Sequence, residues 1–194
     1  MKPFHSLLTL ALLIAVSTLP STSSGQLIVA HRGASHDAPE NTLAAFRLAW
    51  DRGADAIEGD FHLTSDQQII CSHDKNTKRV CPTHDNLTIA DTDLTTLQSL
   101  DVGSWKSPQF AKEKMPTLAE VLATVPPGKQ IFIEIKSGPE ILPALRRQLA
   151  ASKLKPNQIR LICFKTKVVQ QARQLMPQYR ANWLTDYRFK GHGD

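Results

Sequence analysis

Three short apolar runs in the first third of the chain each meet a group of ionisable side chains. Short apolar runs without alternation are typical of strands that are covered on both faces of a parallel sheet. The ends of such strands are where a sheet presents polar groups to a cleft. The ionisable residues are His31 and Arg32 after LIVA, Glu58 and Asp60 within AIEGDFHL, and His73 after IIC.

The rest of the chain alternates strand-like and helix-like segments. Strands are expected at 27–30, 54–63, 68–71, 130–136, 159–164 and 179–184, and helices at 43–52, 94–100, 117–124, 140–152 and 167–175. Asn41 or Thr42 is expected to cap the first of these helices, and Thr117 and Glu120 have capping-box spacing. This order predicts an α/β fold with mostly parallel strands, in which 54–63 and 68–71 form a tight pair.

The N-terminus has the pattern of a secretory signal peptide. Lys2 precedes the apolar stretch 7–16, and small and polar residues dominate as far as Gly25, so residues 1–25 are expected to be removed. The alternative, an uncleaved anchor, is disfavoured because a membrane-spanning helix needs roughly 20 apolar residues. We therefore expect a secreted or periplasmic protein with no stable membrane anchor after cleavage.

Composition limits the class of ligand. The 194 residues are enough for one domain, and the net charge of +5 comes without a run of Lys or Arg. This mild excess is a weak indication of an anionic ligand and does not favour nucleic-acid binding. Of the three cysteines, Cys71 and Cys81 could pair in an oxidising compartment, or all three could be free; Cys163 lies in an apolar run and is expected to be a buried thiol.

Three carboxylates are expected on one polar face of two strands. Glu58 and Asp60 are two residues apart in one strand, and Glu134 alternates with isoleucines in QIFIEIK. Buried charges must be paired or bind a metal, and an oxygen-rich site suits a hard cation such as Ca²⁺ or Mg²⁺. The alternative is a structural salt-bridge cluster with Arg32 and Lys136.

His31 and His73 occupy equivalent positions at the ends of apolar runs. Imidazole titrates near neutral pH, so two such side chains could act as general base and general acid beside a phosphate. Arg32 and Lys136 would add positive charge, Arg with a planar fork of donors and Lys as a point charge.

The order of several short motifs resembles the glycerophosphodiester phosphodiesterase family. The motifs are HRGAS, PENT, LAAF, IEGDFHLTSD, HD, MPTLAEVL and IEIK, and the resemblance runs from about Ile28 to the end of the chain. It implies a TIM (β/α)8 barrel of the phospholipase C-like phosphodiesterase type. It also implies metal-dependent hydrolysis of small glycerophosphodiesters to an alcohol and sn-glycerol 3-phosphate.

The resemblance assigns a role to each candidate site residue. It implies His31 and His73 as the acid–base pair, Glu58, Asp60 and Glu134 as ligands of one divalent cation (Ca²⁺ or Mg²⁺), and Arg32 and Lys136 as phosphate contacts. Three further residues are expected to support these groups: His62, and Glu40 with Asn41, which we expect to order the loop after the first strand. The segment from 75 to about 116 corresponds to the small insertion that covers the site in this family.

The length departs from the family. A TIM barrel needs eight strands and at least about 200 residues, whereas six strands are expected here. We therefore expect a barrel truncated after about six strands, with a phosphodiesterase domain at 26–194 that lacks its C-terminal part. Two alternatives follow: a catalytically inactive fragment or phosphate-binding module, and a phosphodiesterase that acts on lysophospholipids.

Overall fold

The computed structural model describes residues 26–84 and 86–186, so the expected signal peptide at 1–25 lies outside the described residues. The strands are β1 (Val29–His31), β2 (Ala56–Leu63), β3 (Ile69–Cys71), β4 (Gln130–Ile135), β5 (Ile159–Cys163) and β6 (Arg180–Trp183). The α-helices are α1 (Leu43–Asp51), α2 (Leu94–Ser99), α3 (Leu118–Thr124), α4 (Leu142–Ala151) and α5 (Thr166–Leu175), joined by four short 3₁₀ turns, Ile89–Asp91, Pro108–Phe110, Pro139–Ile141 and Pro156–Gln158. The α/β class and the six expected strands are confirmed.

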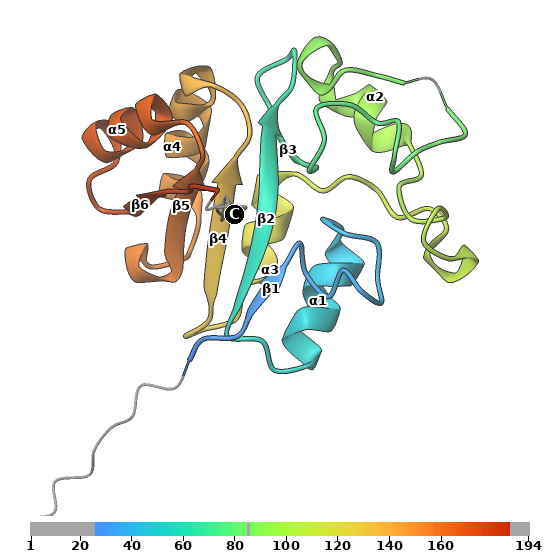
Figure 1. Ribbon diagram of the computed structural model, residues 1–194, viewed down its shortest axis with the longest axis horizontal. Helices are drawn as coiled ribbons and strands as arrows, with labels where there is room; N and C mark the ends of the chain where they lie inside the picture. Colours follow the sequence, from blue (N-terminus) through green and yellow to red (C-terminus); the bar gives the residue numbers. More distant parts are fainter. Residues whose placement is uncertain (1–25, 85, 187–194) are drawn as a thin grey trace, which may run out of the picture.

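All six strands belong to one sheet, but only five of them are parallel (Figure 1). The parallel strands follow the order β1-β2-β4-β5-β6, while β3 pairs antiparallel with the end of β2. The connection between β2 and β3 is too short for the crossover of a dozen or more residues that a parallel pair requires. The tight pair is therefore confirmed, and five strands rather than six occupy successive positions of a partial TIM barrel.

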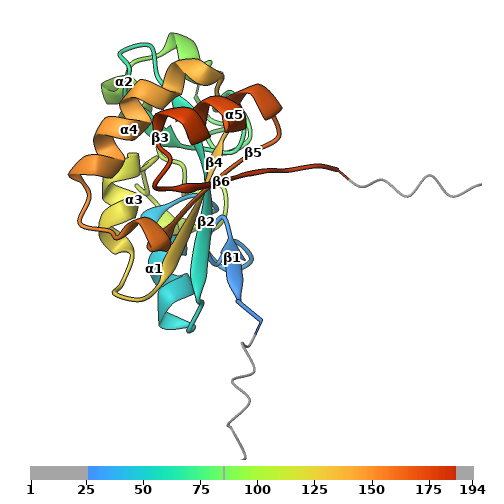
Figure 2. The ribbon, with the colours of Figure 1, turned by 90° about the vertical axis from the view of Figure 1, so that its left-hand side faces the viewer.

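The helices α1, α3, α4 and α5 cover one face of the sheet (Figure 2). Ile131, Ile133 and Ile135 of β4 point to this face and are buried, whereas Phe132 and Glu134 point to the other. Phe46 of α1 is fully buried in the same core. The opposite face of the sheet is therefore free to carry the polar residues. Among the described residues, no helix has the length and apolar character needed to cross a membrane.

The loop between β1 and α1 lies against the start of the helix. Thr42 is the N-cap of α1, and its hydroxyl accepts a hydrogen bond from the Ala45 amide at 3.2 Å. Gly33 has φ +78°, and a Cβ at this position would lie 2.7 Å from the carbonyl carbon of Ala45. Both the left-handed backbone and the close approach require glycine here. The capping box of Thr117 and Glu120 at α3 is also confirmed.

The described residues of the insertion, 75–84 and 86–116, pack around a separate apolar cluster. Its buried members are Ile70, Val80, Cys81, Ile89, Leu97, Leu100, Val102 and Met115. This segment, green in Figure 1, lies beyond the ends of β2 and β3. All three cysteines are free and buried, so the pairing of Cys71 with Cys81 is not formed. The two thiols face different partners: Cys71 lies 3.2 Å from Asn41 Oδ1, and Cys81 lies 3.3 Å from His84 Nδ1.

We expect Phe46→Ala to lower the free energy of unfolding by about 3–5 kcal/mol, because it opens a cavity between α1 and the sheet. Urea unfolding followed by circular dichroism measures this change. The neighbouring variant Arg47→Ala changes an exposed side chain and should stay within about 0.5 kcal/mol of the wild type. Equal stabilities for the two variants would contradict the placement of Phe46 in the core.

Candidate functional site

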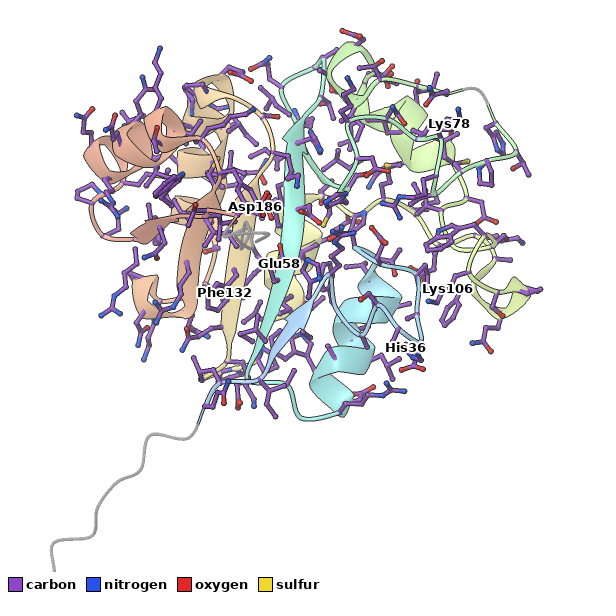
Figure 3. All side chains as sticks on the ribbon, in the orientation of Figure 1. His36, Glu58, Lys78, Lys106, Phe132 and Asp186 are labelled. Atoms are coloured by element: carbon purple, nitrogen blue, oxygen red, sulfur yellow. The ribbon has the colours of Figure 1, made fainter. Side chains whose placement is uncertain are left out.

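Three carboxylates converge on the face of the sheet opposite the helices. Glu58 and Asp60 come from β2 and Glu134 from β4, and Asp60 is the direct register partner of Glu134. One oxygen from each residue lies within 4.8 Å of the other two. The three residues are buried, with exposed fractions of 5%, 0% and 8%. Figure 3 shows Glu58 and Phe132 on the neighbouring strands β2 and β4.

Two oxygens of this cluster lack a hydrogen-bond partner among the described residues. They are Glu58 Oε1 and Asp60 Oδ1, both buried. Burial, together with the charges of Asp60 and Glu134, raises the pKa of Glu58 to about 8. A buried ionised group without compensation costs several kcal/mol. Hard oxygen ligands with unmet hydrogen-bonding capacity fit a divalent cation, so the residues present are suited to holding one.

Two cationic side chains partly compensate the cluster. Arg32 Nε lies 3.4 Å from Asp60 Oδ2. Lys136 Nζ lies 2.9 Å from Glu134 Oε1 and 3.4 Å from Asp60 Oδ1. The salt bridges of the alternative interpretation therefore exist, but two cations face three carboxylates. Within 26–84 and 86–186, Glu58 forms no ion pair with Lys or Arg; its Oε2 accepts the backbone N–H of Arg32 at 3.0 Å.

Asn41 holds Asp60 in place. Its amide Nδ2 donates to Asp60 Oδ2 at 2.8 Å, and its Oδ1 accepts the backbone N–H of Asp60 at 3.2 Å. Asn41 and Arg32 both have φ +59°, which non-glycine residues seldom adopt. Such strain persists where the surroundings fix the backbone, and here it directs both residues at the carboxylates. Asn41 therefore does more than order the loop after β1, because it fixes one oxygen of the cluster.

The two histidines lie at or just after the ends of two different strands. His31 is the last residue of β1, and its Nε2 lies 3.8 Å from Glu58 Oε2 in a side chain that is 67% exposed. His73 follows β3, is 32% exposed, and its Nδ1 lies 2.7 Å from Asp74 Oδ1. His62 is buried and its Nε2 lies 3.3 Å from the carbonyl oxygen of His73. Desolvation lowers the pKa of His62, so it is a neutral support for the backbone of His73.

Sequence reasoning assigned no role to two residues of this site, Asp74 and Arg79. The guanidinium of Arg79 contacts both Asp74 and Glu40. Glu40 in turn accepts a hydrogen bond from Arg32 Nη1 at 3.1 Å. Arg79 lies in the long segment after Asp74, which has no periodicity from which its orientation could be read. The available signal was the carboxylate that directly follows His73, because such a carboxylate needs a partner.

The structure thus brings the sequence-predicted residues into one connected group. Contacts of 3.8 Å or less link the carboxylates Glu58, Asp60 and Glu134, the cations Arg32 and Lys136, the histidine His31, and the loop residues Glu40 and Asn41. The histidines His62 and His73 join this group through Asp74 and Arg79. The group combines three buried carboxylates that could hold a cation, two positive side chains and three imidazoles. This combination suits acid–base chemistry on a phosphate ester.

Comparisons with known proteins agree with this chemistry. Residues 31–190 match the model of the glycerophosphoryl diester phosphodiesterase family. A glycerophosphodiester phosphodiesterase of Bacillus subtilis is 33% identical over 186 residues, which cover 84% of this chain and 62% of the relative. One of Caldanaerobacter subterraneus is 40% identical over 126 residues, which cover 63% of this chain and 50% of the relative.

A solved structure shows the same fold. It is an Oleispira antarctica phosphodiesterase in complex with the product sn-glycerol 3-phosphate, 29% identical, with a TM-score of 0.76 over 81% of this chain and 65% of the other. The chain therefore spans half to about two thirds of the length of these three proteins. The parallel sheet corresponds to part of the TIM barrel of these enzymes. From the family match and the shared fold, we conclude that this chain belongs to the glycerophosphoryl diester phosphodiesterase family.

Proposed function

We propose that this protein hydrolyses small glycerophosphodiesters to an alcohol and sn-glycerol 3-phosphate, with one divalent cation, Ca²⁺ or Mg²⁺. The observation that carries the proposal is the buried trio Glu58, Asp60 and Glu134, with oxygens that lack hydrogen-bond partners within the described part of the chain. The product held by the Oleispira relative has the same chemical class as the product proposed here. The expected leader at 1–25 supports a secreted or periplasmic location.

The reaction adds water across a P–O bond. One imidazole, of His31 or His73, removes a proton from the nucleophile, which is water or the glycerol 2-hydroxyl group. The other imidazole gives a proton to the departing alcohol oxygen. After the step, the imidazole that was neutral is protonated and the one that was protonated is neutral. If the 2-hydroxyl attacks first, water opens the resulting cyclic phosphate in a second step with the roles reversed.

The charged side chains bind and orient the phosphodiester. Arg32 and Lys136 have donors beyond those used by the carboxylates, and these can contact phosphate oxygens. Glu58, Asp60 and Glu134 would hold the cation. When bound, the cation supplies Lewis-acid stabilisation of the negative charge that develops on the phosphate.

A second candidate function is a phosphate-binding module without turnover. The observation in its favour is the open sheet: five parallel strands are described, whereas a closed TIM barrel has eight. The edge strands β1 and β6 each have one neighbour, so the wall that would face the histidines from the other side is absent from the described residues. Release of product with added metal, as against phosphate binding without release, separates the two functions.

We expect His31→Ala and His73→Ala each to reduce kcat by about 10²–10⁴-fold on glycerophosphocholine, because each removes one proton-transfer group. Release of sn-glycerol 3-phosphate measures the rate, and circular dichroism checks the fold. The control His36→Ala alters an exposed imidazole on the loop that follows His31, and it should keep the wild-type rate. A variant of His31 or His73 that retains the wild-type rate removes that residue from the mechanism.

We expect EDTA to abolish product release and added Ca²⁺ or Mg²⁺ to restore it. Glu134→Gln should weaken binding of the cation at least about tenfold, since a neutral amide is a poorer ligand for a hard cation than a carboxylate. Isothermal titration calorimetry measures this change. Glu140→Gln, which alters an exposed carboxylate after β4, is the matched control. An unchanged titration for Glu134→Gln would return this residue to the salt-bridge interpretation.

Binding of the cation should become tighter as pH rises. The pKa of Glu58 is raised to about 8, so without the ion Glu58 is mostly protonated at neutral pH, and the cation must displace that proton. We expect release of about one proton at pH 7 and an affinity that increases up to roughly pH 9 and then levels off. Calorimetry in buffers of different ionisation enthalpy counts the protons. Glu58→Gln should bind more weakly and release none; the same proton count in this variant would exclude Glu58 as the source.

A further inference from the structure

Arg79 joins two carboxylates that come from two different loops, one after β1 and one after β3. Its Nε lies 2.8 Å from Asp74 Oδ2, and Asp74 belongs to the loop that follows β3. Its Nη1 and Nη2 lie 2.9 Å from the two oxygens of Glu40, in the loop after β1. All three guanidinium nitrogens therefore have an acceptor. This fork geometry is specific to arginine, since an ammonium group cannot present three donors in one plane.

The first arm of this arrangement leads to His73. Asp74 uses its other oxygen, Oδ1, to contact His73 Nδ1 at 2.7 Å. The hydrogen bond to Arg79, and then that to His73, lowers the pKa of Asp74 to about 2. Asp74 is therefore ionised at neutral pH and can only accept. It follows that Nδ1 of His73 carries a hydrogen, and Nε2 is the nitrogen left to exchange a proton with substrate.

The second arm leads to the phosphate-binding side of the site. Glu40 Oε1 accepts from Arg79 Nη2 and also from Arg32 Nη1, at 2.9 and 3.1 Å. Arg32 in turn lies 3.4 Å from Asp60. One carboxylate thus links the guanidinium beside His73 with the guanidinium beside the three acidic residues.

We propose that Arg79 is a positioning residue: through Asp74 it holds His73 as the Nδ1–H tautomer, and through Glu40 it holds His73 in register with Arg32. The inference deepens the proposed function and rests on it. It also gives the segment 75–116 a part in the site, because Arg79 belongs to that segment whereas its two acceptors, Asp74 and Glu40, lie outside it.

A purely structural role makes a different prediction. If Arg79 only fastened the segment 75–116 to the sheet, its loss would lower stability and leave the His73 tautomer unchanged. The tautomer is therefore the deciding readout. It is visible in the long-range ¹H–¹⁵N spectrum of the imidazole at about pH 9, where histidine is neutral. The signals of His73 are assigned by their absence in His73→Ala.

The variants are Arg79→Gln, Arg79→Lys, Asp74→Asn and the double variant Arg79→Gln/Asp74→Asn. We expect Nδ1–H to dominate in the wild type and to lose that dominance in Arg79→Gln. Arg79→Lys keeps the positive charge but can pair with only one of the two carboxylates. Its Nδ1–H population should therefore lie between those of the wild type and Arg79→Gln. In the tautomer readout the double variant should match Asp74→Asn, because the effect of Arg79 on the tautomer passes through Asp74. The control, Lys78→Ala, changes the exposed neighbour labelled in Figure 3 and should match the wild type.

Turnover of glycerophosphocholine with added Ca²⁺ or Mg²⁺ gives the second readout. Arg79→Gln should lower kcat by about 10- to 100-fold, as expected for a misplaced catalytic group, and change KM by less than about threefold. A wild-type tautomer in Arg79→Gln, with or without a loss of stability, would overturn the inference. Absence of turnover in the wild-type chain would refute the proposed function, and the His73 spectrum would still decide whether Arg79 sets the tautomer.

Discussion

The electrostatic cost of placing Glu58, Asp60 and Glu134 together on one buried face is the constraint on which the site depends. Two cations face the three carboxylates, and burial, together with the charges of Asp60 and Glu134, raises the pKa of Glu58. The surrounding residues act to offset this cost, through the amide of Asn41, the ion pairs of Arg32 and Lys136 and the backbone N–H of Arg32. A divalent cation would complete the compensation, and this is the basis of the proposed cation site.

Parallel pairing brings distant residues to this one place. His31, Glu58 and Phe132 are register partners across β1, β2 and β4, although about one hundred residues separate the first from the last. The antiparallel β3 then returns the chain so that His73 lies beside the end of β2. Each catalytic candidate is thus fixed by a strand end, where the backbone is rigid, while Arg79 is supplied by the segment beyond.

The open sheet gives the site an unusual setting. The described strands form five eighths of a TIM barrel, and large apolar side chains are exposed at or beside both edges, among them Val29, Phe164 and Trp183. Exposed edges and apolar surface are disfavoured in isolated domains, and a closed barrel removes them. The chain spans half to about two thirds of the length of its relatives. A measurement of turnover would show whether the open sheet supports catalysis or phosphate binding alone.

The sequence by itself determined the strands, the helices, the capping box of α3 and the three carboxylates of the candidate site, because each is encoded by local periodicity or by motifs such as HRGAS and IEIK. Tertiary structure alone decided that the strand Ile69–Cys71 is antiparallel, that Cys71 and Cys81 do not pair, and that Asn41 holds Asp60. It also decided the partner of Asp74, Arg79. The physical reason is that the latter features depend on which surfaces the packed sheet and the insertion bring within hydrogen-bond distance, and no local pattern carries that information.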